Sequence, residues 1–99
     1  MKNIKLTEDE KVILKNIDKR YKWIARDDNG SLFIYGEKPI KKESSWISKT
    51  LIDWCGIRIF NHLFQSIKWE DEEPYLIEDL LKEDDYDEEE NGVPFDDEE

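Results

Sequence analysis

Sulfur and imidazole chemistry is scarce in this chain of 99 residues, which has one cysteine, Cys55, and one histidine, His62. A single cysteine excludes an intrachain disulfide and a zinc site built from several cysteines. A catalytic cysteine–histidine pair would also need a third group and an electropositive setting for the thiol. Because both residues stand among aromatic residues in the sequence, we expect them in the core, in structural roles.

Long apolar runs and glycine-rich motifs are also missing. The chain has no charged-then-apolar leader and no apolar run long enough to cross a membrane, which predicts a cytoplasmic protein. It has no glycine-rich phosphate loop, and its many carboxylates crowd one end, where water is hard to exclude. The sequence therefore predicts neither an enzyme nor a cofactor.

Basic residues almost disappear after Trp69. Residues 70–99 hold 17 acidic residues and a single base, whereas residues 1–69 hold 9 acidic and 14 basic ones, within a net charge of −11. Large apolar residues thin out after residue 81. This asymmetry predicts one small domain over residues 1–82, followed by an acidic tail at residues 83–99.

The first half of the chain predicts a helix and a hairpin. Thr7 and Glu10 have the spacing of a capping box, which predicts a helix from Glu8 to about Asp18. Large apolar residues alternate with charged or small ones over residues 21–26, and a second apolar run follows a turn rich in aspartate, asparagine and glycine. This pattern predicts an antiparallel hairpin over residues 21–35.

The second half predicts short elements. Residues 40–45 fit a solvated loop or an edge, and residues 46–56 fit either a strand or a short helix. Apolar residues recur at helical spacing over 59–66, residues 66–69 fit the end of a strand, and Pro74 favours a helix over 74–82. The predicted fold class is α+β, with an N-terminal helix on a small antiparallel sheet, short C-terminal helices and an acidic tail.

Two binding chemistries find little support. Residues 87–98 imitate a calcium-binding loop, but Glu89 and Pro94 depart from its pattern, so we expect no specific metal site. The basic residues of the body suggest contact with phosphate, but the acidic tail would repel a nucleic acid. We therefore expect no direct binding to nucleic acid.

The acidic end allows two interpretations, a disordered solubilising tail or a mimic of nucleic-acid phosphates. In the second, the carboxylates fill a basic channel, because the residue spacing of an extended chain is similar to the phosphate spacing of about 3.4 Å along one DNA strand. The predicted partner-binding residues are acids and two aromatic anchors: Glu70, Asp71, Glu72, Glu73, Glu78, Asp79, Glu83, Asp84, Asp85, Tyr86, Asp87, Glu88, Glu89, Glu90 and Phe95.

Four stretches carry a resemblance: YKWIARD from residue 21, LFIY from 32, KP at 38–39 and LFQSIKWEDEEP from 63. Over about residues 6–82 the chain resembles small acidic proteins encoded by phages and prophages of low-GC Gram-positive bacteria. The resemblance carries over no catalytic residue. It implies, by analogy with phage inhibitors of Cas nucleases, restriction enzymes and DNA-repair enzymes, a protein that binds a host protein.

The sequence thus predicts a phage-encoded inhibitor, a monomer or small oligomer, that blocks a host nucleic-acid enzyme by occupying its nucleic-acid groove. A Cas nuclease is the first candidate target. Two alternatives stay open. One is a non-enzymatic adaptor that binds through the hairpin and exposed tryptophans such as Trp46 and Trp54, with a tail that only solubilises. The other is a small enzyme centred on Cys55 and His62.

Overall fold

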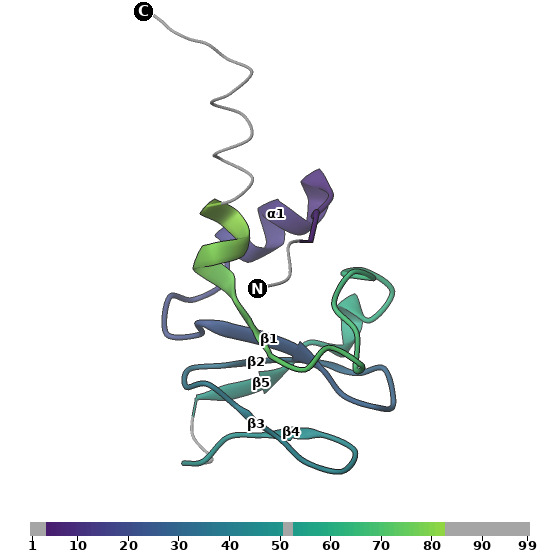
Figure 1. The fold of residues 1–99 in the computed structure, drawn as a ribbon. Helices are drawn as coiled ribbons and strands as arrows, with labels where there is room; N and C mark the ends of the chain where they lie inside the picture. Colours follow the sequence, from purple (N-terminus) through teal and green to yellow (C-terminus); the bar gives the residue numbers. More distant parts are fainter. Residues whose placement is uncertain (1–3, 51–52, 83–99) are drawn as a thin grey trace, which may run out of the picture.

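The computed structural model describes residues 4–50 and 53–82, which form an α+β arrangement (Figure 1). The main sheet has four antiparallel strands in the order β5–β2–β1–β6, and β3 and β4 form a separate two-stranded sheet. Helix α1 (Glu8–Lys15) and a helical segment at residues 77–82 lie on the same side of the main sheet. The predicted α+β class and the N-terminal helix on an antiparallel sheet are confirmed, and the predicted tail lies outside the described residues.

Helix α1 starts where the capping box predicts. The Glu10 amide donates to the Thr7 hydroxyl at 3.2 Å, and the Glu10 carboxylate accepts from the Thr7 amide at 3.1 Å. These two bonds satisfy backbone donors that the first turn of a helix leaves free. The helix ends at Lys15 rather than Asp18, because the side-chain and backbone amides of Asn16 bond the carbonyls of its last turn.

Strands β1 (Trp23–Arg26) and β2 (Leu32–Tyr35) form the predicted hairpin. The Gly30 amide donates to the Asp27 carbonyl at 2.9 Å, and Gly30 has a φ of 93°. Glycine adopts this backbone conformation without a steric cost. A turn followed by a left-handed glycine is a common three-residue hairpin loop, and it sets the register of the two strands.

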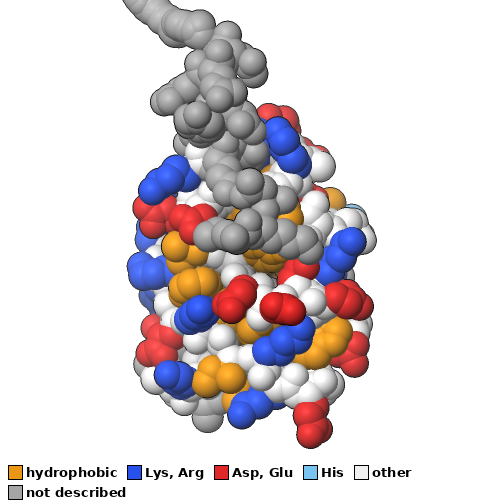
Figure 2. Space-filling model, in the orientation of Figure 1, with side chains coloured by type: hydrophobic (Ala, Val, Ile, Leu, Met, Phe, Trp, Pro, Cys, Tyr) orange, Lys and Arg blue, Asp and Glu red, His pale blue; other side chains and the backbone are white. Residues whose placement is uncertain are grey.

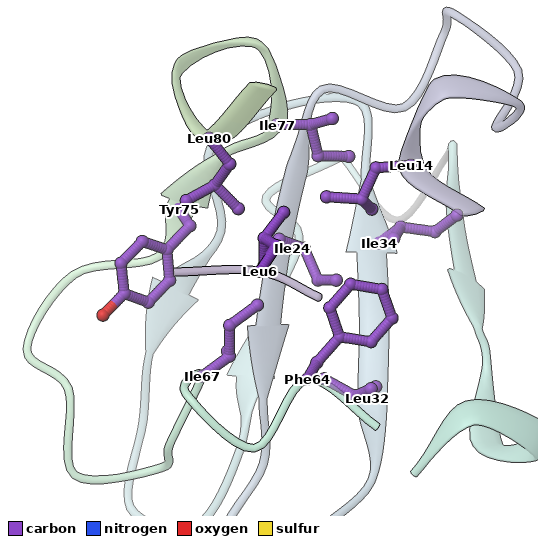
Figure 3. Close-up of a cluster of buried hydrophobic side chains, with 10 residues drawn as sticks. All are labelled: Leu6, Leu14, Ile24, Leu32, Ile34, Phe64, Ile67, Tyr75, Ile77 and Leu80. Atoms are coloured by element: carbon purple, nitrogen blue, oxygen red, sulfur yellow. The ribbon is translucent and has the colours of Figure 1, made fainter. Parts of the chain in front are cut away.

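The alternation of residues along the hairpin divides the core into one cluster on each face of the sheet. On the opposite side from the helices, Ala25 and Tyr35 pack with Trp46 of the two-stranded sheet. The molecule therefore has three layers: helices, main sheet and the β3–β4 ribbon. Figure 3 shows the larger cluster, under the helices, which consists of Leu6, Leu14, Ile24, Leu32, Ile34, Phe64, Ile67, Tyr75, Ile77 and Leu80.

The strand interpretation holds at both ends of residues 46–56. Strand β4 (Trp46–Ile47) pairs with β3 (Ile40–Lys41), so the region expected to be a loop or an edge contains a short strand. Strand β5 (Trp54–Gly56) pairs with the outer side of β2. The prediction of strand or helix is thus decided in favour of strand, with residues 51–52 outside the described part.

The helix predicted over residues 59–66 is wrong. One 3-10 turn, η1 (Arg58–Phe60), is followed by turns through residue 70, so the strand end predicted at 66–69 is also wrong. The amides of this segment bond carbonyls three residues back, and Phe64 has a φ of 55°. A non-glycine residue in this left-handed conformation interrupts any regular helix.

Arg26 explains why this segment is not helical. Its guanidinium donates to five backbone carbonyls at 2.7–3.1 Å, and four of them lie between residues 61 and 67. Glu10 adds a second constraint, because its carboxylate accepts from the Phe64 amide at 2.7 Å. These bonds take the carbonyls and the amide that a helix would pair along its own axis.

The helix predicted from Pro74 starts later than expected. Strand β6 (Tyr75–Leu76) comes first and pairs with β1, and the helical residues begin at 77. The Ile77 amide donates to the Lys22 carbonyl at 2.8 Å, which extends the β6–β1 pairing by one bond. Pairing with β1 therefore overrides the helix start that proline favours.

Candidate partner-binding groove

A groove of about 730 Å³ lies where the turn before β6 approaches β1, and it holds several of the predicted partner-binding acids. Its volume is within the range of small-molecule and peptide pockets. Its lining combines acidic side chains with aromatic and apolar ones, and we call the aromatic and apolar part the floor. The lining residues are Trp23, Lys38, Glu70, Asp71, Glu72, Glu73, Pro74, Tyr75, Leu76, Asp79 and Leu80.

The exposed acids of this acidic groove are Glu70, Glu72 and Glu73, and Asp79 joins them half-buried. These four residues are the predicted partner-binding acids that the structure brings together at the surface of this groove. Glu78 is exposed but lines a different groove, between α1 and residues 77–82. The other predicted residues lie outside the described part of the chain: Glu83, Asp84, Asp85, Tyr86, Asp87, Glu88, Glu89, Glu90 and Phe95.

Asp71 has a structural role instead. It is buried, and its carboxylate accepts from the Tyr75 hydroxyl at 2.8 Å and from the Lys68 amide at 3.0 Å. Burial and the neighbouring carboxylate both raise the pKa of Tyr75, so the phenol stays a hydrogen-bond donor. We therefore remove Asp71 from the predicted contact residues, since it positions the turn that presents its neighbours.

A lysine from the body fixes the same turn. The Lys41 ammonium donates to the carbonyls of Trp69 and Asp71 at 2.6 and 3.0 Å, and it lies 4.2 Å from the centroid of the Trp69 ring. A cation over an indole ring adds electrostatic attraction to the two hydrogen bonds. Lys41 of β3 thus holds the turn that carries the groove acids Glu70, Glu72 and Glu73.

One cation of the protein already lies in the acidic groove. The Lys38 ammonium is 3.2 Å from the Glu73 carboxylate and 5.7 Å from the centroid of the Trp23 ring. Both side chains of the ion pair are more than half exposed, so the pair contributes little to stability and is easily displaced. Carboxylate and ring together form a place that attracts a positive charge.

Sequence reasoning missed the floor of the groove. Trp23 and Leu76 come together on one face of the sheet because β1 and β6 are neighbours and the two residues pair across 52 intervening positions, whereas Tyr75 faces the larger cluster on the other side. No local pattern in the sequence encodes that pairing. The only available signal was the alternation over residues 21–26, which places Trp23 and Ile24 on opposite faces of its strand.

Cys55 and His62 are both exposed, so the prediction that they lie in the core is wrong. Cys55 is on an edge strand, and His62 follows η1 in a turn. Among residues 4–50 and 53–82, no group of three histidine, cysteine, aspartate or glutamate side chains is placed to hold a metal ion. The calcium-like sequence at 87–98 lies outside these residues.

The surface of the body carries both signs of charge. Figure 2 shows acidic, basic and apolar side chains alternating over the face that it draws, without a single large acidic patch. No helix in the described ranges is both long and apolar enough to span a membrane. Comparisons with protein-family models, curated proteins and solved structures find no match to this chain.

Proposed function

We propose that this protein is a phage-encoded inhibitor that binds a basic, nucleic-acid-binding surface of a host enzyme and blocks access of nucleic acid. The observation that carries the proposal is the acidic groove, which Glu70, Glu72, Glu73 and Asp79 line together with Trp23. The groove precedes residues 83–99, which hold 11 acids. The groove supplies negative charge from the folded body, and residues 83–99 supply more from the part of the chain that follows it.

The chemistry of the groove favours arginine on the partner. A guanidinium stacks on an indole such as Trp23, and its planar fork bonds carboxylates with two parallel hydrogen bonds. Lysine offers a compact charge without that fork. Nucleic-acid enzymes bind phosphates with arginine and lysine side chains, so their empty grooves present the side chains that this groove accepts.

The fixed acids improve the affinity for such a surface. Glu70, Glu72 and Glu73 are on a turn that Lys41 and Asp71 hold in place. Ordered charges lose less conformational entropy on binding than charges on a flexible chain. In an extended conformation the acids of residues 83–90 would continue the charge at a spacing similar to that of phosphates, and Tyr86 and Phe95 would supply apolar anchors.

A Cas nuclease of the host cytoplasm is the first candidate target, followed by restriction and DNA-repair enzymes. Fluorescence anisotropy of labelled DNA tests the proposal against a purified Cas nuclease with its guide, a restriction endonuclease and a DNA-repair glycosylase. We expect the full chain to displace DNA from one of them. Displacement should weaken about tenfold in the triple variant Glu70→Gln/Glu72→Gln/Asp79→Asn, which loses three groove charges.

A charge-matched control separates the groove from net charge. The triple variant Asp28→Asn/Glu37→Gln/Glu43→Gln removes three exposed carboxylates outside the groove and should displace DNA as well as the parent. Equal weakening of both triple variants would contradict a role for the groove. An absence of displacement from all three enzymes would contradict inhibition by mimicry of nucleic acid.

The structure leaves the adaptor alternative with fewer exposed tryptophans than the sequence suggests. Trp46 is 5% exposed, so it is not available as a binding residue. Trp54 is 47% exposed and retains that possibility. Binding that is lost in Trp54→Ala and kept in the triple groove variant would favour the adaptor over the inhibitor.

A further inference from the structure

Strand β5 forms an open edge of the main sheet, and all three of its residues are exposed. Backbone groups of Asp53 and Ile57 bond the β2 side at 2.6 and 2.9 Å. Because bonding alternates along an antiparallel pair, Cys55 also directs its backbone groups toward β2, and Trp54 and Gly56 direct theirs outward. In the described ranges no strand pairs with that outer edge.

The edge lacks the usual protections against pairing. Natural edge strands carry lysine, proline or a bulge that stops another strand from adding to the sheet. Residues 54–57 are tryptophan, cysteine, glycine and isoleucine, none of them charged. The shortness of β5 is the one protection it has, so we expect a weak and reversible association.

The surface next to the edge has an exposed indole and a hollow. Trp54 is 47% exposed, and its ring centroid lies 5.9 Å from that of Phe33. A hollow of about 450 Å³ lies beside Gly56, lined by Phe33, Trp54, Gly56, Ile57, Arg58 and Ile59. The Phe33 ring packs where a side chain at Gly56 would be, since an added Cβ would lie 3.2 Å from it.

We propose that β5 pairs with β5 of a second copy of this chain, antiparallel, about a two-fold axis at Cys55. In that register Trp54 lies opposite Gly56 of the second copy, and their outward backbone groups bond each other. The indole of Trp54 then enters the hollow beside the facing glycine. A two-fold axis repeats both contacts, which makes the interface self-complementary.

The charges at the ends of the strand suit the same arrangement. Asp53 precedes β5 and Arg58 follows it. An antiparallel pair brings Asp53 of one copy to the end where Arg58 of the second copy lies. The acidic groove is on β6, at the opposite edge of the sheet, so the strongest negative charge of the two copies stays apart.

Cys55 provides a specific probe of this interface. At the two-fold axis it forms a non-hydrogen-bonded pair with its copy, with Cα atoms about 4.5 Å apart, which is within the range of a disulfide. Diamide oxidises such a pair: the two thiols give up two protons and two electrons, and the azo group of the reagent is reduced to the hydrazo form. The disulfide serves as a trap and is not part of the proposed state.

The test uses the full chain and compares two positions of its single thiol. The variant Cys55→Ser/His62→Cys moves the thiol to another exposed site. With diamide, we expect the parent to cross-link about tenfold or more faster than this variant, because pairing raises the effective concentration of the thiol. Sedimentation velocity of the reduced parent should show a fraction of dimer that increases with protein concentration.

A further variant tests the register. Trp54→Lys removes the exposed indole and adds a charge to the edge, and it should lower cross-linking to the rate of the relocated thiol. Circular dichroism checks that this variant is folded. Equal cross-linking rates at the two thiol positions, with only monomer in sedimentation, would overturn the proposal, and this comparison does not depend on the folding of Trp54→Lys. It is also independent of the proposed inhibitor function.

Discussion

Asp27, which follows β1 in the hairpin, is hydrogen-bonded to the β3–β4 ribbon. Its carboxylate accepts from the buried Trp46 amide at 3.0 Å, and the Tyr35 hydroxyl donates to the Trp46 carbonyl at 3.3 Å. Desolvation raises the pKa of Asp27 above its usual value of 3.8, and the bond from Trp46 opposes that shift only in part. The Asp27 carboxyl therefore helps to hold the ribbon, beside the bonds of Tyr35 and the Trp46 indole, and its burial has a desolvation cost.

The prediction at this scale concerns pH. Since the folded pKa of Asp27 is raised, the folded state binds its proton more tightly than the unfolded state above pH 3.8, and stability falls as pH rises through the folded pKa. Asp27→Asn keeps an acceptor oxygen without the charge. It should be at least as stable as the parent at neutral pH, and that advantage should shrink toward acidic pH in urea unfolding.

Asp27→Ala is the matched comparison, because it leaves the Trp46 amide without its acceptor. We expect it to lose about 1–3 kcal/mol of the free energy of unfolding at neutral pH. If the parent and Asp27→Asn show the same pH dependence, the carboxyl is solvated and the assigned desolvation is wrong.

At the scale of elements, residues 57–67 show what a sequence pattern does and does not determine. The helical spacing correctly indicates that Phe60, Leu63, Phe64 and Ile67 face the core. It fails to give the backbone, because the partner of the segment's carbonyls is Arg26, about 40 positions earlier in the chain. Spacing records which side is apolar, and a distant hydrogen-bond donor decides how the chain turns.

Arg26→Lys tests that interpretation. Lysine keeps the charge but lacks the planar fork that reaches carbonyls on several sides, so some of the five are left unsatisfied. We expect a loss of about 2–4 kcal/mol in urea unfolding. Arg20→Lys, at an exposed arginine paired only with surface carboxylates, should change stability by less than about 0.5 kcal/mol. Equal effects of the two changes would contradict the role given to Arg26.

Other elements differ in how much the sequence reveals. The capping box and the hairpin depend on residues close together in the chain, so their start and their turn could be predicted. The floor of the acidic groove depends on the β1–β6 pairing, and the burial of Asp71 depends on Tyr75. The local sequence does not distinguish the residues in these contacts from their exposed neighbours, so the contacts could not be predicted.

At the scale of the whole molecule, the fixed contact surface and much of the negative charge lie in different parts of the chain. The acidic groove holds charge in a fixed geometry, and most of the remaining acids come after residue 82. Long-range charge accelerates encounter with an oppositely charged surface, whereas close and desolvated contacts slow dissociation. The two parts should therefore affect different rate constants.

Deleting residues 83–99 removes 11 acids and leaves the groove. Against the target found by DNA displacement, we expect the association rate to fall about tenfold or more and to depend less on ionic strength, with a smaller change in the dissociation rate. Surface plasmon resonance at low and high salt measures both. Unchanged association would contradict the role given to the tail and favour a solubilising one.

The strand order β5–β2–β1–β6 also has a consequence for local opening. Strands β1 and β2 are at the centre and are joined by a tight hairpin, whereas β6 pairs through two residues and β5 through three. Edge segments with few contacts detach at a lower free energy than the centre of a sheet. Strand β5 is therefore a segment that can rearrange around a partner while the hairpin and its core stay folded, whereas the turn before β6 is held by Lys41 and Asp71.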